Sequence, residues 1–224
     1  MNPLKPSLKS EWLPLSLIIL SVALAGYFYA VSPATVPIHW GINGQPDGYA
    51  GRAFAACLMP GIALVLYLLM TFLPRLDPKK DQYAAFGKQF AAIRNLMLVF
   101  LLVLGGLAGW AGTGREVRMD MAVACLVGLL FISLGYYVAT VKQNWFMGAR
   151  TPWTMSSPEV WRKTNRLMGY VMAIAGLMIA ATALAPVAWA KVALFATAIA
   201  GVILIPIIAS YVFYRKEQAA AAKR

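Results

Sequence analysis

The side chains that could do chemistry lie in two short stretches of this chain, separated by long apolar runs. The first stretch is Pro37–Arg52, and its candidate ligand-contacting residues are Pro37, His39, Trp40, Asn43, Asp47 and Tyr49. The second stretch is Asn144–Tyr170, and its candidate motif residues are Asn144, Phe146, Gly148, Arg150, Thr151, Pro152, Trp153, Glu159, Trp161, Thr164 and Asn165. We expect function to depend on these two stretches.

His39 is the single histidine of the chain, and few acids could accompany it. Those acids are Asp47 and, further along, Glu116 or Asp120. A zinc site usually takes more His or Cys ligands than this set offers. We therefore expect no metal here, and interpret His39 as a hydrogen-bonded anchor of its loop or as a ligand contact. The run Pro46-Asp47-Gly48 is typical of turns, which predicts a compact loop.

The second stretch offers no pair of nucleophile and base, because the only histidine lies in the first. A glycine-rich phosphate-binding loop is also absent from it. We expect no catalytic residue, no cofactor and no enzymatic activity. A hairpin anchored in the membrane interface by Trp and Arg would explain its aromatic and basic residues. The density of specific polar groups favours a functional motif instead.

A helix begins within this second stretch, and two starting points fit. Ser156 and Glu159 have the spacing of a capping box. Alternatively Ser157 caps the helix and Pro158 takes its first position. The following residues share one helical face: Trp161, Thr164, Asn165 and Met168. Across the preceding turn we expect Arg150 to pair with Glu159.

The elements that must position these stretches are membrane helices. The 224 residues are 61% hydrophobic and only 12% charged, against roughly 25% charged in a soluble domain. A helix needs about 20 mostly apolar residues to span a bilayer. Six segments qualify: Trp12–Val31, Phe54–Pro74, Asn95–Gly112, Met119–Val141, Leu167–Ala185 and Val192–Tyr214. The sequence predicts an all-α polytopic membrane bundle of six transmembrane helices.

The distribution of basic residues predicts the orientation of this bundle. Sixteen of the 20 Lys and Arg residues fall on one side of it. The other four are Arg52, Arg115, Arg118 and Lys191. Because Lys and Arg are enriched in cytoplasmic loops, both termini and the inner loops 75–94 and 142–166 are expected in the cytoplasm, with loop 32–53 outside. The net charge of +12 therefore indicates a lipid bilayer as partner and no nucleic acid.

We divide the chain into an N-terminal membrane region, 1–94, and a C-terminal one, 95–224. In the loop 75–94, aromatic and apolar residues recur at helical spacing, namely Tyr83, Phe86, Phe90 and Ile93. They fit a short helix on the inner leaflet or a cytoplasmic extension of the third span. Small residues on two spans predict close helix packing: Gly105, Gly109, Gly169, Ala173, Gly176 and Ala180.

The second stretch resembles the signature of the SdpI family of bacterial immunity proteins. The resemblance is carried by N-x-F-x-G-x-R-T-P-W-T followed by S-x-E-V-W-x-K-T-N-R-x-x-G, from Asn144 to Gly169. The first stretch resembles the N-terminal membrane domain of unknown function that often accompanies that family, through Pro37, His39, Trp40, Gly44, Asp47 and Tyr49. Ala149 departs from the branched apolar residue expected at its position.

The resemblance implies a multi-pass protein of the bacterial cytoplasmic (inner) membrane that gives resistance to a secreted peptide toxin. It also implies, for some relatives, signalling through a cytoplasmic regulator. In this interpretation the outer loop meets the toxin and the inner loop carries its state inward. The alternative is a small transporter or lipid-handling membrane protein, with a cavity lined by Asn144, Arg150 and Asn165 at its inner mouth.

Overall fold

The computed structural model describes residues 4–223; Arg224, counted above among the inner charges, lies outside them. The elements in chain order are α1 (Leu8–Val31), β1 (Thr35–Trp40), β2 (Pro46–Gly51), α2 (Arg52–Leu76), the 3₁₀ turn η1 (Lys80–Gln82), α3 (Tyr83–Gly112), α4 (Met119–Val138), α5 (Pro152–Ser156), α6 (Pro158–Ala181), the 3₁₀ turn η2 (Thr182–Leu184) and α7 (Ala188–Ala221).

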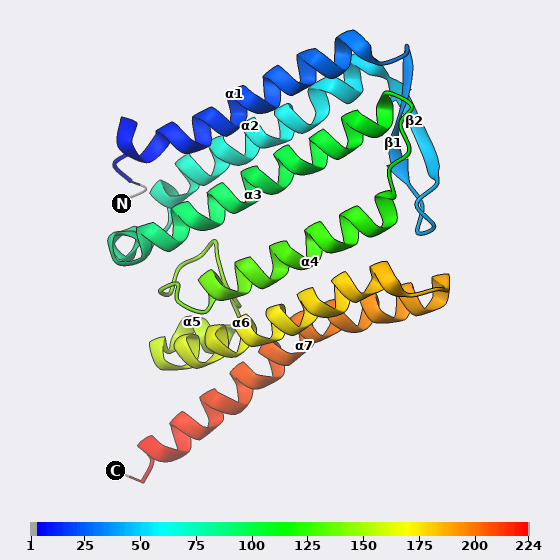
Figure 1. Ribbon diagram of the computed structural model, residues 1–224. Helices are drawn as coiled ribbons and strands as arrows, with labels where there is room; N and C mark the ends of the chain where they lie inside the picture. The colour runs from blue at the N-terminus through cyan, green and yellow to red at the C-terminus, as the bar shows by residue number, and fades with distance from the viewer. Residues whose placement is uncertain (1–3, 224) are drawn as a thin grey trace.

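Six of these helices are long and apolar enough to cross a membrane, which confirms the predicted all-α polytopic bundle. Helices α1, α2 and α3 pack on one another, and we call them, with the hairpin, the N-terminal unit. Helix α6 packs on α4 and α7, and these three form the C-terminal unit. The two units lie side by side, joined along α3 and α4 (Figure 1).

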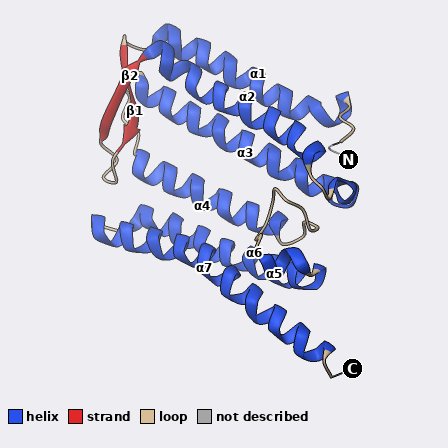
Figure 2. Cartoon of the chain, turned by 180° about the vertical axis from the view of Figure 1, so that it is seen from behind, coloured by secondary structure: helices blue, strands red, loops and turns tan. Residues whose placement is uncertain are grey.

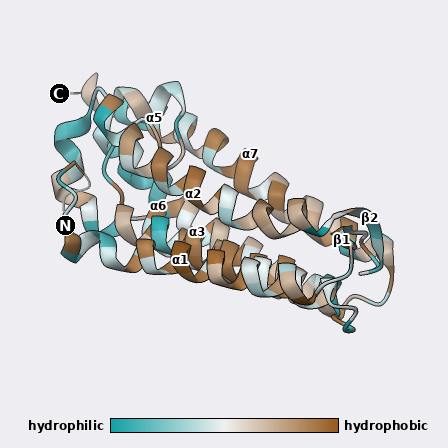
Figure 3. Cartoon of the chain, turned by 90° about the horizontal axis from the view of Figure 1, so that it is seen from above, coloured by the Kyte–Doolittle hydropathy of each residue, from teal (hydrophilic) through white to brown (hydrophobic). Residues whose placement is uncertain are grey.

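The two ends of the bundle differ in what they carry. Both termini, the α2–α3 connection and α5 lie at one end, and the β-hairpin lies at the other (Figures 1 and 2). Hydrophilic residues gather mainly towards these ends, while hydrophobic residues dominate the middle of the helices (Figure 3). By the distribution of Lys and Arg, the end with the termini is the inner one.

The segment 75–94 is the cytoplasmic extension of the third span, one of the two alternatives left open. Helix α3 starts at Tyr83 and runs on to Gly112, with non-helical backbone angles only at Phe86. The aromatic and apolar residues of the extension are buried in a core cluster with Trp161 of α6. They are therefore covered by protein and not by the inner leaflet. Helix α3 also runs across the predicted division between residues 94 and 95, which stays a prediction.

Helices α4 and α6 approach closely through two reciprocal pairs of glycines. A Cβ added to Gly135 would lie 2.7 Å from the carbonyl oxygen of Gly169, and one added to Gly128 would lie 2.5 Å from that of Gly176. The converse additions give the same distances. Only glycine fits such a backbone contact, so the predicted packing role of Gly169 and Gly176 is confirmed.

Candidate functional site

The outer loop is an antiparallel hairpin, which makes it more regular than the compact loop expected from its turn residues. Strand β1 pairs with β2 from Thr35 opposite Gly51 to Trp40 opposite Pro46. In the connecting turn the side chain of Asn43 accepts a hydrogen bond from the backbone of Gln45 at 3.1 Å. Asn43 therefore shapes the turn.

Four of the six predicted outer residues line one cleft. Pro37, Trp40, Asn43 and Tyr49 lie along its hairpin side. The opposite side is the α3–α4 connection, which contributes charged residues: Arg115, Glu116, Arg118 and, from the first turn of α4, Asp120. A polar cleft thus opens between the hairpin and this connection.

His39 and Asp47 are paired with each other across the two strands. The Nδ1 of His39 lies 2.5 Å from Oδ1 of Asp47, and both side chains are exposed. In residues 4–223 no group of three or more metal-ligating side chains comes together. The pair fits the interpretation of His39 as a hydrogen-bonded anchor of the hairpin.

A second, apolar groove lies beneath the hairpin, between the two units. Its walls come from β1, α2, α3, α4, α6 and α7. Trp40 and Asp120 line both this groove and the polar cleft. At its mouth, the ammonium of Lys191 lies 2.8 Å from Asp120 and 3.4 Å from the carbonyl oxygen of Ile42. Lys191 therefore links the hairpin tip to the outer end of the C-terminal unit.

The inner motif begins with a turn in which the side chain of Asn144 makes hydrogen bonds to the backbone on both sides of it. Its Oδ1 accepts hydrogen bonds from the backbone amides of Phe146 and Met147, at 2.8 and 2.7 Å. Its Nδ2 donates to the carbonyl oxygens of Lys142 and Met147. Asn144 is fully buried. Its amide is occupied by the loop, and it lines neither of the two hollows beside the hairpin.

Asn165 holds the next part of the motif. Its Oδ1 accepts from the amide of Ala149 at 2.8 Å, and its Nδ2 donates to the carbonyl of Trp161. The backbone of Gly148 passes directly over it with φ of +99°, and an added Cβ there would lie 2.4 Å from Oδ1. Trp161 in turn donates from Nε1 to the carbonyl of Val141 at 2.9 Å. The predicted shared face of α6 is thus the buried face that receives the loop.

Two caps connect the motif to α7. Thr151 caps α5 with Pro152 after it, and its hydroxyl donates to Ser210 of α7 at 3.0 Å. Ser157 caps α6 with Pro158 at the first position, so the second of the two predicted helix starts is observed. The hydroxyl of Ser157 also contacts Glu217 at 3.0 Å. An N-cap contributes about 1 kcal/mol to helix stability.

The predicted pairing of Arg150 with Glu159 is wrong. Glu159 pairs with Arg162 at 2.7 Å and Lys163 at 3.2 Å, which follow it on the same helix. Arg150 donates instead to the carbonyl oxygen of Trp145. Neighbours three and four positions apart on a helix meet without any loop ordering, which favours the local pairs.

The remaining motif residues pack against neighbouring elements or lie buried. The ring of Trp153 lies 5.2 Å from that of Tyr211 on α7. Phe146 packs against the core cluster around Tyr83 and Trp161. Thr164 is fully buried, and its hydroxyl has no hydrogen-bond partner among the described residues.

Asp77 is a structural centre that sequence reasoning missed. It is only 2% exposed. Its Oδ2 accepts from the hydroxyl of Tyr83 at 2.8 Å and from the backbone amide of Trp145 at 2.9 Å, and its Oδ1 accepts from the amide of Lys79 at 2.7 Å. Asp77 therefore ties the N-terminal unit to the start of the inner motif. Only its position in the turn sequence after Pro74 could have pointed to it.

A buried ion pair was also missed. Arg94 lies 2.9 Å from Glu11 of α1, and both side chains are almost fully buried. The hydroxyl of Tyr67 on α2 donates to the same carboxylate at 3.1 Å. Arg94 had been placed in the cytoplasmic loop, where a basic residue signals orientation only. It instead joins the inner ends of three helices.

Comparisons with known proteins agree with both predicted resemblances. Residues 140–210 match the SdpI/YfhL protein family, and residues 16–64 match a domain of unknown function (DUF1648). The chain is 27% identical over 173 residues to the immunity protein SdpI of Bacillus subtilis (strain 168), a match that covers 77% of this chain and 81% of that protein. No solved structure matches the chain. The resemblance to the SdpI family and its accompanying domain is confirmed.

Proposed function

We propose that this multi-pass membrane protein, similar to SdpI over most of its length, is an immunity protein of the bacterial inner membrane that gives resistance to a secreted peptide toxin. The similarity to a named immunity protein supports the class of function. The six apolar helices support its place in a membrane. The protein acts by binding, without catalysis.

The observation that carries this proposal is the pair of hollows on either side of Trp40. One is polar and lined by charged residues of the α3–α4 connection. The other is apolar and lies between the two units. A membrane-active peptide needs both kinds of surface, and tryptophan and tyrosine often dominate the affinity of such interfaces. Trp40 and Tyr49 are the aromatic residues that the hairpin offers to such a peptide.

The test is survival of cells that carry the protein and are challenged with the sporulation-delaying peptide toxin. We expect Trp40→Ala to lower the toxin concentration that stops growth by about tenfold, since removal of an aromatic anchor costs 1–2 kcal/mol or more. The control is Trp189→Ala, because Trp189 is 74% exposed at the outer end of α7 and lines none of these hollows. If cells with the unaltered protein die as readily as cells without it, the proposal is wrong.

We further propose that a cytoplasmic regulator binds to the inner motif. The motif carries three exposed basic residues, Arg150, Arg162 and Lys163, of which the last two also pair with Glu159. Such a surface suits an acidic partner. Recruitment of a fluorescently labelled regulator to the membrane should then respond to toxin in cells with the unaltered protein and be lost in Arg150→Ala. If recruitment of the regulator changes neither with toxin nor with Arg150→Ala, the proposed docking on the inner motif is wrong and protection is the sole function.

A further inference from the structure

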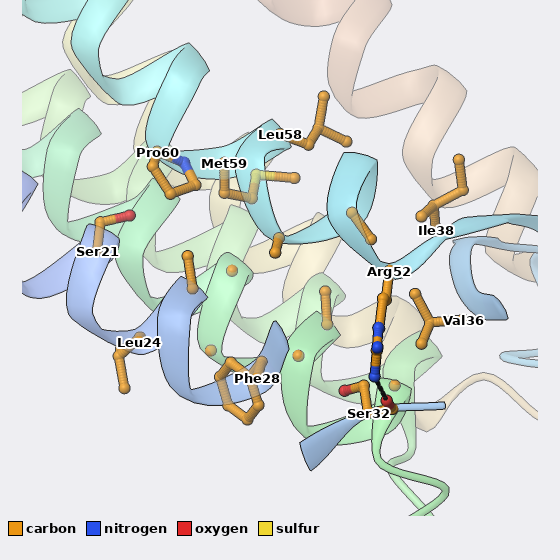
Figure 4. Close-up of a pocket in the computed structure, with 18 of the residues that line it drawn as sticks. Ser21, Leu24, Phe28, Ser32, Val36, Ile38, Arg52, Leu58, Met59 and Pro60 are labelled. Atoms are coloured by element: carbon orange, nitrogen blue, oxygen red, sulfur yellow. Dashed lines mark hydrogen bonds between the residues drawn. The ribbon is translucent and has the colours of Figure 1, made fainter. Parts of the chain in front are cut away.

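A third hollow lies inside the N-terminal unit, away from the inner motif. It borders the polar cleft at Pro37 and Gly112, and the apolar groove at Ile38, Met59 and Ala108. It is partly open to its surroundings. Its walls are α1, α2 and α3, and β1 covers its outer end (Figure 4). Most of the lining is aliphatic or small, with Leu24, Met59 and Pro60 among the larger residues.

One small residue of α3 in the wall of the cavity has nothing packed against it. An added Cβ on Gly109 would lie 2.2 Å from the ring of Phe28, and one on Gly105 would lie 3.1 Å from Met59. Those two glycines allow close packing. An added Cβ on Gly106 would meet no atom within 4 Å. Gly106 therefore faces empty space within the wall of the cavity.

The outer end of the cavity carries Ser32 and Arg52, and Arg52 is the one charged residue in its lining. Ser32 is only 7% exposed and lines the cavity at this end. Beside it, Arg52 donates from Nη1 to the carbonyl of Ser32 at 3.1 Å (Figure 4). The guanidinium also stacks over the ring of Tyr29. Among residues 4–223, no carboxylate lies within ion-pair distance of Arg52. A planar guanidinium of this kind suits a phosphate group.

The length of the cavity matches one leaflet. It extends along α1 from Ser21 to Ser32, and eleven residues of helix rise by about 16 Å. Half of a hydrocarbon core is about 15 Å thick. The backbone amides of a peptide segment would need hydrogen-bond partners along the whole apolar cavity. An acyl chain needs no such partners and therefore suits the cavity better.

We propose that this cavity binds one acyl chain of an anionic glycerophospholipid from the outer leaflet. The phosphate lies on Arg52, and the hydroxyl of Ser32 donates to an oxygen of the head-group region. The chain runs inward past Gly106 towards Ser21. The bound lipid fills the centre of the N-terminal unit and holds β1, hence the hairpin, against the outer ends of α1 and α3.

Native mass spectrometry of the full-length protein tests this site with phosphatidylglycerol as the probe. We expect one phosphatidylglycerol to stay bound in detergent that strips the surrounding lipid. Gly106→Leu should weaken its binding by about tenfold or more, because a Leu side chain occupies the volume of several methylenes of the ligand, each worth about 0.8 kcal/mol. The control is Gly61→Leu, since a Cβ on Gly61 also meets nothing within 4 Å but Gly61 does not line the cavity.

Arg52→Gln provides a second variant that leaves the apolar wall intact. We expect it to abolish the preference for phosphatidylglycerol over phosphatidylcholine, because the anionic head group loses the guanidinium that binds it. Equal retention of phosphatidylglycerol by Gly106→Leu and the unaltered protein would overturn the proposal. Photo-crosslinks at residue 106 to the toxin peptide, and none to lipid, would also overturn it. The mass-spectrometric measurements use no toxin, so failure of the immunity function would leave their outcome unaffected.

Discussion

Single residues of the inner motif act by closing its own loop. Asn144 and Asn165 are fully buried, and each satisfies backbone groups of the connection between α4 and α5. Buried amides with such partners rigidify a loop, because any other arrangement leaves polar groups unpaired. The sequence predicted that these residues matter. It could not predict their partners, which are backbone atoms without any signature in the sequence.

The position of Gly148 gives the first prediction from these contacts. Gly148→Ala forces a side chain into a backbone with φ of +99° and against Asn165 at 2.4 Å. We expect a loss of about 2 kcal/mol or more in the free energy of unfolding, of which the backbone alone contributes 1–2 kcal/mol. Thermal unfolding in detergent measures it. Gly61→Ala, in open space on α2, should change stability little, and equal melting of the two variants would refute the account.

At the scale of elements, the six spans were predictable and their ends were not. Apolar length alone identifies each span. The start of α3 was left between two alternatives, because the sequence does not show whether Tyr83, Phe86 and Phe90 bury their rings in protein or in lipid. The hairpin was also missed, since Pro37 and the glycines of Pro37–Arg52 weaken any strand pattern. Its turn residues predicted only compactness.

The contact between α4 and α6 gives a prediction at this scale. Gly169→Leu should push the two helices apart, because an added Cβ already lies 2.7 Å from the carbonyl oxygen of Gly135. We expect a lower midpoint of thermal unfolding and loss of toxin resistance. Gly61→Leu adds the same bulk at an open helical position and should retain both. A Gly169→Leu protein as stable as Gly61→Leu would contradict the close contact.

At the scale of the whole molecule, Asp77 and Lys191 join the two units at opposite ends. Asp77 binds the amide of Trp145 at the inner end, and Lys191 joins Ile42 to Asp120 at the outer end. Neither link was predictable. Each joins residues at least 68 positions apart in the chain, and single-sequence patterns report only on near neighbours.

Removal of the inner link should loosen the motif loop. Asp77→Ala leaves the amide of Trp145 and the hydroxyl of Tyr83 without their acceptor, at a cost of about 1–3 kcal/mol for each buried group. We expect trypsin to cleave after Lys142 or Arg150 about tenfold faster in inside-out vesicles, because local opening becomes easier by that free energy. Asp81→Ala, which removes an exposed acid nearby, is the control. Unchanged cleavage would exclude Asp77 as the link.

Lys191 joins the tip of the hairpin to the C-terminal unit, so a change at this link would let the hairpin move relative to that unit. A peptide bound as proposed, against Trp40 and the apolar groove, would compete with Ile42 and Asp120 for that ammonium. It would then open the outer link while the Asp77 link stays closed. The units can then pivot about the inner end. Helix α3 has 30 residues and is about 45 Å long, so a rotation of about 5° displaces the hairpin by about 4 Å. In this proposal the rotation would reach the inner motif at Trp145, whose amide binds Asp77 near the pivot.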